Sequence, residues 1–319
     1  MPEKTLADND IEAEHSRYVV SEDIRLLLAS WCKENNFEIP DAVFFEALRR
    51  RMHEKLESIF PHAEVVCVSE AEIVDPLHAL LAESNDPTVS LDRVYTQQEL
   101  LLDYTRLVDK DYNFIGLGSR TQESISRQVA RIADSVKRHG SIQLVDDVVF
   151  SGDGIVEVIE WFNAHNIKVS RVVAGISINE SRERVVTACA NDNPGISVVS
   201  VKHFSNVLDE ICERDFYPGV PLAGRLIGMK GADHSKPLYP ELGAPYILPY
   251  GKPEKWASIP GDRAREWSLF CLDQAQTLWR IIERLSSRSV FCEDLSRRPV
   301  FASEGTRIVE ELGKQMAAL

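Results

Sequence analysis

The sequence predicts an α/β protein with a Rossmann-like parallel sheet flanked by helices. Two observations lead to this fold class. Between residues 112 and 201, apolar segments of strand length alternate with amphipathic segments of helix length. The strand candidates are apolar over most of their length, as is typical of parallel strands that are covered on both faces. A chain of 319 residues is also long enough to bury a sizeable core.

The first third of the chain is expected to be mainly helical. Residues 1–20 are acidic and polar, and we expect a flexible tail there. The N-terminal helical region, 21–110, contains apolar residues at helical spacing and possible N-caps at Ser21 and Asp41. The segments expected in it are helices at 21–34 and 41–59, a short strand at 64–69, and helices near 75–83 and 97–108.

The α/β core is expected over residues 111–212. Its elements, in chain order, are a strand at 112–118, a helix at 122–138, a strand at 141–147, a helix at 154–166, a strand at 168–178 and a strand near 196–201. The remaining region, 213–319, is rich in proline and glycine up to residue 265, which predicts ordered loops. An amphipathic helix is expected to close it at 266–287.

Composition narrows the classes of function. The 50 acidic residues outnumber the 36 basic ones, so the net charge of -14 makes binding to nucleic acid unlikely. No apolar run reaches the roughly 18 residues that a membrane helix needs, and the N-terminus lacks the features of a secretory signal. The six cysteines form no CxxC pair, and we expect them to be reduced. A cytoplasmic protein without a membrane partner is predicted.

One segment carries recognisable chemistry. Residues 142–154 read as an apolar strand, two adjacent acids, a short apolar stretch, a small turn and the start of a helix. Ligands of an open parallel sheet bind at the carboxyl ends of its strands. The turn and the helix N-terminus offer backbone N–H groups to an anion, and neighbouring carboxylates accept hydrogen bonds from two vicinal hydroxyls. Together these features predict a site for a ribose 5-phosphate group.

At these residues the sequence resembles the type I phosphoribosyltransferase family, through the stretch VDDVVFSG. The resemblance implies a phosphoribosyltransferase core that binds phosphoribosyl pyrophosphate. It implies that Asp146 and Asp147 hold the ribose hydroxyls, directly or through water on Mg²⁺. The residues that it implies for the 5-phosphate are Val148, Phe150, Ser151, Gly152, Asp153 and Gly154. The alternative is that the acids merely end a strand and the turn merely caps a helix.

Two positions depart from the family pattern. Gly154 stands where the family usually has threonine or serine, so one hydroxyl donor to phosphate is missing. Asp153 places a carboxylate in the phosphate loop. We expect that carboxylate to point away from the ligand or to cap the helix, because it would otherwise repel an anion.

The family also needs a pyrophosphate loop, for which two locations are open. One candidate is the turn after the strand at 112–118, with Gly118, Ser119, Arg120 and Thr121. It could equally be an ordinary strand-to-helix turn. Only one helix separates it from the motif strand, where the family usually has more. The pyrophosphate loop would otherwise lie earlier in the chain.

A nitrogenous acceptor, either a nucleobase or an unusual amine, is expected against residues that follow the later strands. Phe216 or Tyr217 would stack on a base there, and Asp215 or Arg225 would bind its polar edges. The alternative is a packed aromatic loop without a ligand. A lid formed by residues 245–260, with Lys252, Lys255 and Trp256, is a further expectation.

Two functions from different classes are compatible with these observations. One is a magnesium-dependent transferase that moves the phosphoribosyl group to the acceptor. The other is a non-catalytic, nucleotide-binding regulator, in which the basic cluster Arg49–Arg51 would contact a partner. The acidic net charge does not favour the second. A homodimer is compatible with the sequence, which does not determine the oligomeric state.

Overall fold

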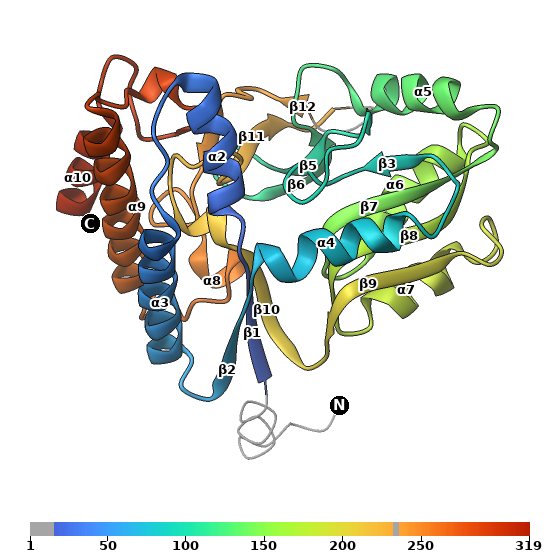
Figure 1. Ribbon diagram of the computed structural model, residues 1–319, viewed down its shortest axis with the longest axis horizontal. Helices are drawn as coiled ribbons and strands as arrows, with labels where there is room; N and C mark the ends of the chain where they lie inside the picture. The colour runs from blue at the N-terminus through green and yellow to red at the C-terminus, as the bar shows by residue number, and fades with distance from the viewer. Residues whose placement is uncertain (1–15, 232–235) are drawn as a thin grey trace.

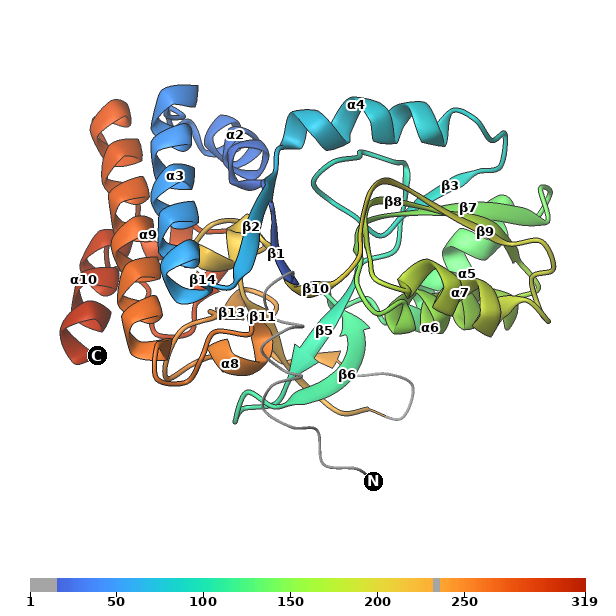
Figure 2. The same ribbon diagram turned by 90° about the horizontal axis from the view of Figure 1, so that it is seen from below.

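The computed structural model describes residues 16–231 and 236–319, which form an α/β fold with parallel sheets flanked by helices. Three sheets are present (Figure 1). A five-stranded parallel sheet lies at one end, a helical layer lies at the other, and the other two sheets lie between them (Figures 1 and 2). The predicted fold class is confirmed.

The five-stranded sheet contains the motif strand at its centre. Its order is β4 (Leu100–Leu101), β3 (Thr88–Ser90), β7 (Ser141–Val149), β8 (Lys168–Ile178) and β9 (Ser197–Phe204), and every pair is parallel. Helix α4 (Glu70–Leu81) covers one face (Figure 2). The other face is covered by α5 (Ile125–Val136), α6 (Asp153–Asn163) and α7 (Ser181–Cys189).

Residues of β7 and β8 are apolar on both faces because helices pack on both. Val145 and Val173 belong to the apolar cluster under α4, whereas Leu144 and Val172 belong to the cluster under α5, α6 and α7. Burying both sets of side chains orients the two central strands firmly between the helices. The carboxyl end of β7 is therefore held in a fixed position.

The other two sheets, one of three strands and one of six, join distant segments of the chain. The parallel sheet has the order β10 (Val207–Cys212), β1 (Ser16–Ser21) and β2 (Ala63–Val68). The mixed sheet has the order β14 (Arg298–Pro299), β13 (Leu242–Ala244), β11 (Arg225–Met229), β5 (Tyr104–Val108) and β6 (Phe114–Ser119), and β12 (Lys236–Pro237) pairs with β11. Short helical segments are η1 (Glu213–Phe216), α8 (Pro253–Trp256) and η2 (Cys292–Asp294).

The helical layer packs against the sheet of β10, β1 and β2. It consists of α2 (Ile24–Asn35), α3 (Ala42–Ile59), α9 (Ala264–Ser286) and α10 (Ile308–Ala318). Helices α2, α3 and α9 were predicted at nearly these positions. The largest apolar cluster lies here and includes Trp267 and Trp279, both fully buried.

Three expectations about the organisation of the chain are wrong. Residues 97–108 form β4 and β5 instead of a helix, because β5 pairs with β11 on one side and β6 on the other. Residues 16–20, expected in the tail, belong to β1 between two partner strands, and residues 1–15 lie outside the described part. The core does not begin at residue 111, since β3 pairs directly with the motif strand β7.

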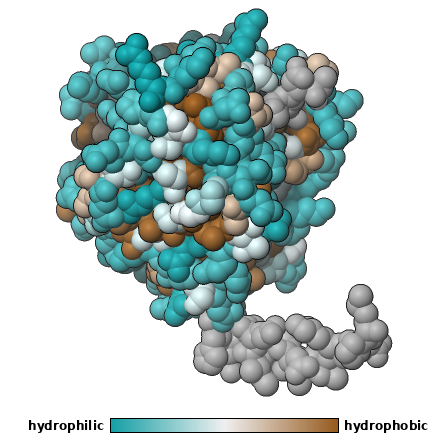
Figure 3. Space-filling model, turned by 90° about the vertical axis from the view of Figure 1, so that its right-hand side faces the viewer, coloured by the Kyte–Doolittle hydropathy of each residue, from teal (hydrophilic) through white to brown (hydrophobic). Residues whose placement is uncertain are grey.

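Figure 3 shows one face of the molecule. Hydrophilic side chains predominate on this face and its apolar patches are small, as expected of a surface in contact with water. Among the described helices, none combines the length and hydropathy required to cross a bilayer. All six cysteines, predicted to be reduced, are free thiols.

A buried ion-pair network holds the helical layer to the sheets. Arg49 of α3 pairs with Glu22, Glu70 and Glu213, at N–O distances of 3.0, 2.9 and 3.0 Å. Burial raises the pKa of Glu22 to about 7 even though Arg49 lies beside it. Arg49 is therefore unavailable to a partner molecule, contrary to the hypothesis of a basic contact surface at Arg49–Arg51.

Replacing Arg49 by methionine is expected to destabilise the protein by about 3–5 kcal/mol, because Glu22 and Glu213 lose their ion-pair partner and Glu70 is left with Arg25. Urea unfolding followed by circular dichroism measures this. The matched control is Arg50→Met on the next, exposed position, for which a change below about 0.5 kcal/mol is expected. Equal unfolding midpoints in the two variants would show that the network is not stabilising.

Candidate functional site

A cavity of about 290 Å³ lies where the carboxyl end of β7 meets β10 and the mixed sheet. Asp146, Asp147, Val148 and Phe150 contribute to its wall. Opposite them lie residues of β10 and η1, and the rest of the lining comes from β5, the turn after β6 and the C-terminal region. The parallel sheet places the motif acids here because its strands end at a common edge.

Asp146 is buried, with 6% of its surface exposed. Its Oδ2 accepts a hydrogen bond from the Tyr104 hydroxyl at 3.2 Å, and its Oδ1 accepts one from the Asp147 N–H at 3.0 Å. Burial raises the pKa of Asp146 well above its usual range, and the nearby carboxylates Asp147 and Asp92 raise it further. A raised pKa favours the protonated carboxyl, which can donate as well as accept a hydrogen bond.

Asp147 is ionised by contrast. Its Oδ2 accepts from Arg214 Nη2 at 3.0 Å and its Oδ1 accepts from the Val148 N–H at 2.8 Å. Burial raises the pKa of Asp147, but the guanidinium of Arg214 and that of Arg120 outweigh burial and hold the pKa below its ordinary value. The pKa values of the two adjacent acids are therefore shifted in opposite directions.

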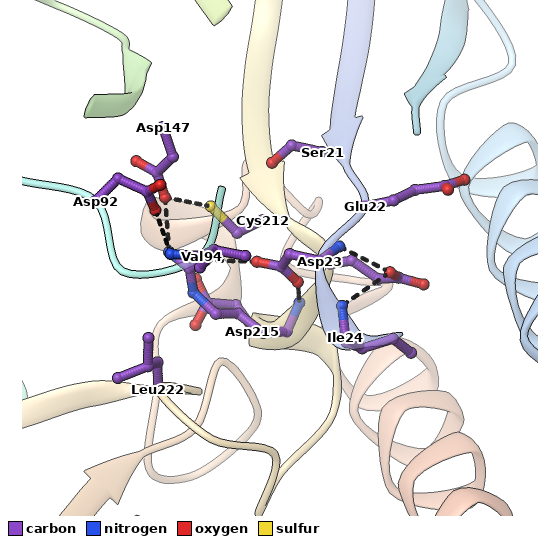
Figure 4. A network of polar contacts seen from close by, with 12 residues as sticks. Ser21, Glu22, Asp23, Ile24, Asp92, Val94, Asp147, Cys212, Asp215 and Leu222 are labelled. Carbon is purple, nitrogen blue, oxygen red and sulfur yellow. Dashed lines mark hydrogen bonds and ion pairs between the residues drawn. The ribbon is translucent and has the colours of Figure 1, made fainter. Parts of the chain in front are cut away.

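Arg214 links the two parallel sheets through this contact. Its guanidinium pairs with Asp147 on β7 and with Asp23, which follows β1, at 3.0 and 2.5 Å. Figure 4 shows Asp147 and Cys212 turned toward one another, with Asp23 at the end of its strand nearby. The Cys212 Sγ lies 3.9 Å from Asp147 Oδ2.

The turn from residue 150 to 154 leads directly into α6. Gly152 has φ 82°, and a Cβ there would come within 2.9 Å of the Ser181 carbonyl oxygen, so this position requires glycine. No side chain caps the α6 N-terminus. A Cβ on Gly154 would lie 3.8 Å from the Tyr104 hydroxyl, which places the start of α6 next to the group that contacts Asp146.

The two departures from the family pattern have local consequences. The carboxylate of Asp153 forms an exposed ion pair with Arg184 of α7 at 3.0 Å, so its charge is directed toward α7. The Ser151 hydroxyl accepts from the Asp153 N–H at 3.3 Å. At Gly154 the neighbouring atoms lie at ordinary contact distances, and the missing hydroxyl leaves the Tyr104 side unobstructed.

In the turn expected to bind pyrophosphate, one residue lines the cavity and the others form contacts within the turn or the sheet. Arg120 lines the cavity. The hydroxyls of Ser119 and Thr121 bond within the turn, since Ser119 Oγ accepts from the Thr121 N–H at 3.0 Å and lies 3.2 Å from Thr121 Oγ1. Gly118 belongs to β6 and pairs with Thr105. Only the arginine faces the cavity.

The alternative was a pyrophosphate loop earlier in the chain, and the loop after β3 is in such a place. Because β3 is parallel to β7, this loop begins at the same sheet edge. Asp92 is buried in it and accepts backbone N–H bonds from Val94, Tyr95 and Thr96, at 2.7, 2.6 and 3.0 Å. Burial, together with the charge of Asp147, raises the pKa of Asp92 to about 6. The carboxylate of Asp92 therefore already accepts hydrogen bonds from the backbone N–H groups that a bound anion would need.

The expectation that Phe216 or Tyr217 stacks on an acceptor is wrong. Both side chains are 1% exposed and packed in the core, where Phe216 meets Trp267 edge to face. Asp215 and Arg225 do line the cavity, as do Tyr246 and Trp256. The Arg225 guanidinium lies 4.3 Å from the Trp256 ring and 5.3 Å from the Tyr246 ring, which holds it rigidly.

Several cavity residues were missed in the sequence. Tyr104 was assigned to a helix, although the alternation of exposed Arg106 with buried Leu107 is a strand signal. Glu210 and Asp209 lie on β10, which has no such signal because its partner β1 is about 190 residues away. Arg297 follows the closing helix. Glu210 accepts from the Ser21 hydroxyl at 2.8 Å, and burial raises its pKa to about 8.

Magnesium is not matched by a set of direct ligands. The oxygens of Asp146 and Asp147 already accept hydrogen bonds from Tyr104, Arg214 and backbone N–H groups. In the described part of the chain, no three His, Cys, Asp or Glu side chains are grouped as metal ligands. The acids can therefore reach a metal ion only through water.

No protein-family model and no curated protein sequence matches this chain. Among solved structures, it is similar to UMP synthase from Leishmania donovani, with 9% identity, a TM-score of 0.24 and coverage of 42% of this chain and 27% of that chain. It is also similar to orotate phosphoribosyltransferase from Aeropyrum pernix, with 15% identity, a TM-score of 0.22 and coverage of 40% and 69%. Similarity at this level carries no argument about function.

The raised pKa of Glu210 makes the stability of the protein depend on pH. As pH rises from the ordinary value of 4.5 toward about 8, the unfolded chain loses this proton and the folded chain keeps it, so stability falls. Glutamine cannot ionise, and Glu210→Gln is therefore expected to gain stability relative to the native protein between pH 5 and pH 8. Urea unfolding at both pH values tests this, with exposed Glu254→Gln as the control. A constant difference across pH would contradict it.

Proposed function

We propose that this protein binds phosphoribosyl pyrophosphate and transfers its phosphoribosyl group to a nitrogenous acceptor. The observation that carries the proposal is the buried pair Asp146–Asp147, which faces a cavity at the carboxyl end of β7 beside the uncapped N-terminus of α6. Such a pair matches a vicinal diol, and a helix N-terminus without a side-chain cap matches a phosphate. The proposed donor carries both groups.

The opposite pKa shifts of the two acids suit the ribose ring. Asp147 is an ionised acceptor, and Asp146 in its protonated form would donate to one hydroxyl oxygen while it accepts from the Tyr104 hydroxyl. Positive charge develops at C1 of the ribose when pyrophosphate leaves. The nearby negative charge of Asp147 stabilises it, and the fixed strand β7 keeps the ring in position.

The 5-phosphate is assigned to the backbone N–H groups at the start of α6. Val148 and Phe150 form the adjoining cavity wall, and Gly152 permits the tight turn. The carboxylate of Asp153 forms an ion pair with Arg184, so in the proposed geometry it faces Arg184 and not the phosphate. The pyrophosphate is assigned to the side of the cavity that contains Arg120.

Magnesium is proposed as a companion of the pyrophosphate. When bound, it neutralises charge on the leaving group. Asp146 and Asp147 would hold it through water, since their oxygens already have hydrogen-bond partners. The acceptor is assigned to the opposite end of the cavity, where Arg225 lies against Trp256 and Asp215 is near. Its nitrogen would attack C1.

A non-catalytic regulator is the second candidate. The observation in its favour is that Asp147 already forms an ion pair with Arg214, which also holds Asp23. A ligand that displaces Asp147 from Arg214 would alter the contact between the two parallel sheets. Such a protein would bind the ribose phosphate without releasing pyrophosphate.

The double variant Asp146→Asn and Asp147→Asn is expected to lose binding of phosphoribosyl pyrophosphate by a factor of about 100 or more, because both acceptors for the diol are weakened. Isothermal titration in the presence of Mg²⁺ measures the affinity, and circular dichroism verifies the fold. Asp192→Asn, at an exposed position, is the control. An affinity within about twofold of the native protein would exclude this site.

A pyrophosphate-release assay with a panel of nucleobases and primary amines separates the two candidates. The transferase predicts release that depends on one acceptor and disappears in the double variant. The regulator predicts tight binding of the donor without release under any of these conditions.

A further inference from the structure

Arg297 is a buried cation at the edge of the cavity. Only 7% of its surface is exposed, and it comes from the segment between η2 and β14, far from the motif strand in sequence. Its Nη1 donates to the carbonyl oxygens of Leu222 and Gly224 at 2.8 and 3.1 Å. These two bonds fix the guanidinium and leave its other donors available to the cavity.

This guanidinium has no carboxylate partner. Within residues 16–231 and 236–319, no acidic oxygen lies at ion-pair distance from Arg297 or from Arg120. Asp215 is close enough to attract Arg297, but its carboxylate accepts from the Gly224 N–H. Burial and, to a smaller extent, the charge of Arg120 lower the pKa of Arg297 to about 9. A buried charge left unpaired is unfavourable, and an anionic ligand would compensate it.

Three arginines from separate segments converge here. Arg120 follows β6, Arg214 is in η1, and Arg297 precedes β14. Among the cavity-lining residues, six are cationic and five acidic. Burial raises the pKa of Asp146 and raises that of Glu210 to about 8, so the cations outnumber the ionised carboxylates at neutral pH. The cavity of this acidic protein is therefore positively charged.

We infer that Arg120 and Arg297 form a binding subsite for a phosphoryl group, and that the C-terminal region completes the cavity by supplying Arg297. Guanidinium groups suit this ligand because their planar forks bond two phosphoryl oxygens at once. The existence of the subsite is inferred from the unpaired charges alone. Which molecule carries the phosphoryl group is an inference that rests on the proposed function. Under that function the group is the pyrophosphate of the donor, and the alternative is the phosphate of a phosphorylated acceptor.

Inorganic pyrophosphate is the probe for the subsite. Isothermal titration of the full chain is expected to show binding, and Arg297→Gln is expected to weaken it roughly 10- to 100-fold, the loss of one charge-assisted contact. The control is Arg298→Gln, because Arg298 pairs with Glu304 instead of facing the cavity. Unchanged pyrophosphate affinity in Arg297→Gln, or no binding of pyrophosphate to the native chain, would overturn the inference.

The source of the phosphoryl group is decided by two further ligands. If it belongs to the donor, Arg297→Gln weakens phosphoribosyl pyrophosphate but leaves ribose 5-phosphate unaffected. If it belongs to an acceptor, the variant binds the donor normally and still loses inorganic pyrophosphate. Pyrophosphate binding to a native chain that fails to bind the donor would retain the subsite and reject the proposed function.

Arg297→Gln could fail to fold, since the native side chain holds two backbone carbonyls. Arg120→Gln then serves as the second variant, because no described residue accepts a hydrogen bond from its guanidinium. The expected loss of pyrophosphate affinity is the same, roughly 10- to 100-fold. An Arg120→Gln protein that binds pyrophosphate as tightly as the native chain would also overturn the inference.

Discussion

The contact on which the site depends is the pair of ion bridges made by Arg214. One bridge reaches Asp147 on the central strand of the five-stranded sheet, and the other reaches Asp23 at the end of β1 in the three-stranded sheet. All three side chains are largely removed from solvent, so removing any one would leave the others uncompensated. The cavity exists because this contact holds two sheet edges face to face.

Charge within the cavity follows from burial as much as from composition. The chain carries a net charge of -14, yet the arginines outnumber the ionised acids where the sheets meet. Burial raises the pKa of Asp146 well above its usual range and that of Glu210 to about 8, whereas Arg214 holds the pKa of Asp147 below its usual value. Adjacent residues of the same type thereby acquire different chemistry, which suits a ligand with both hydroxyl and anionic groups.

The arginines also bear on the choice between a transferase and a regulator. Both functions need the acids and the turn of β7, but a subsite at Arg120 and Arg297 adds a place for a second anionic group beyond a single phosphate. Such a cavity can hold both ends of a donor that carries a 5-phosphate and a pyrophosphate. The Arg49 network, by contrast, is part of the scaffold: it fixes η1 through Glu213, the residue next to Arg214.

Local pattern alone determined the alternation of strands and helices from residue 114 to 178 and the strand β9, because each segment buries its own apolar face and needs no distant information, whereas helix α7 was not predicted. Local pattern also placed the paired acids and the turn at a strand end. Only the tertiary structure decided what surrounds them. Tyr104 lies in a strand held by β11, Glu210 in a strand held by β1, and Arg297 follows the closing helix. The positions of Tyr104 and Glu210 depend on pairing between segments about 120 and about 190 residues apart, for which no local periodicity exists. For Phe216 and Tyr217, local sequence suggested a role that the tertiary structure excludes. The two aromatic side chains are suited to stacking on a base, but they are buried in the core around Trp267.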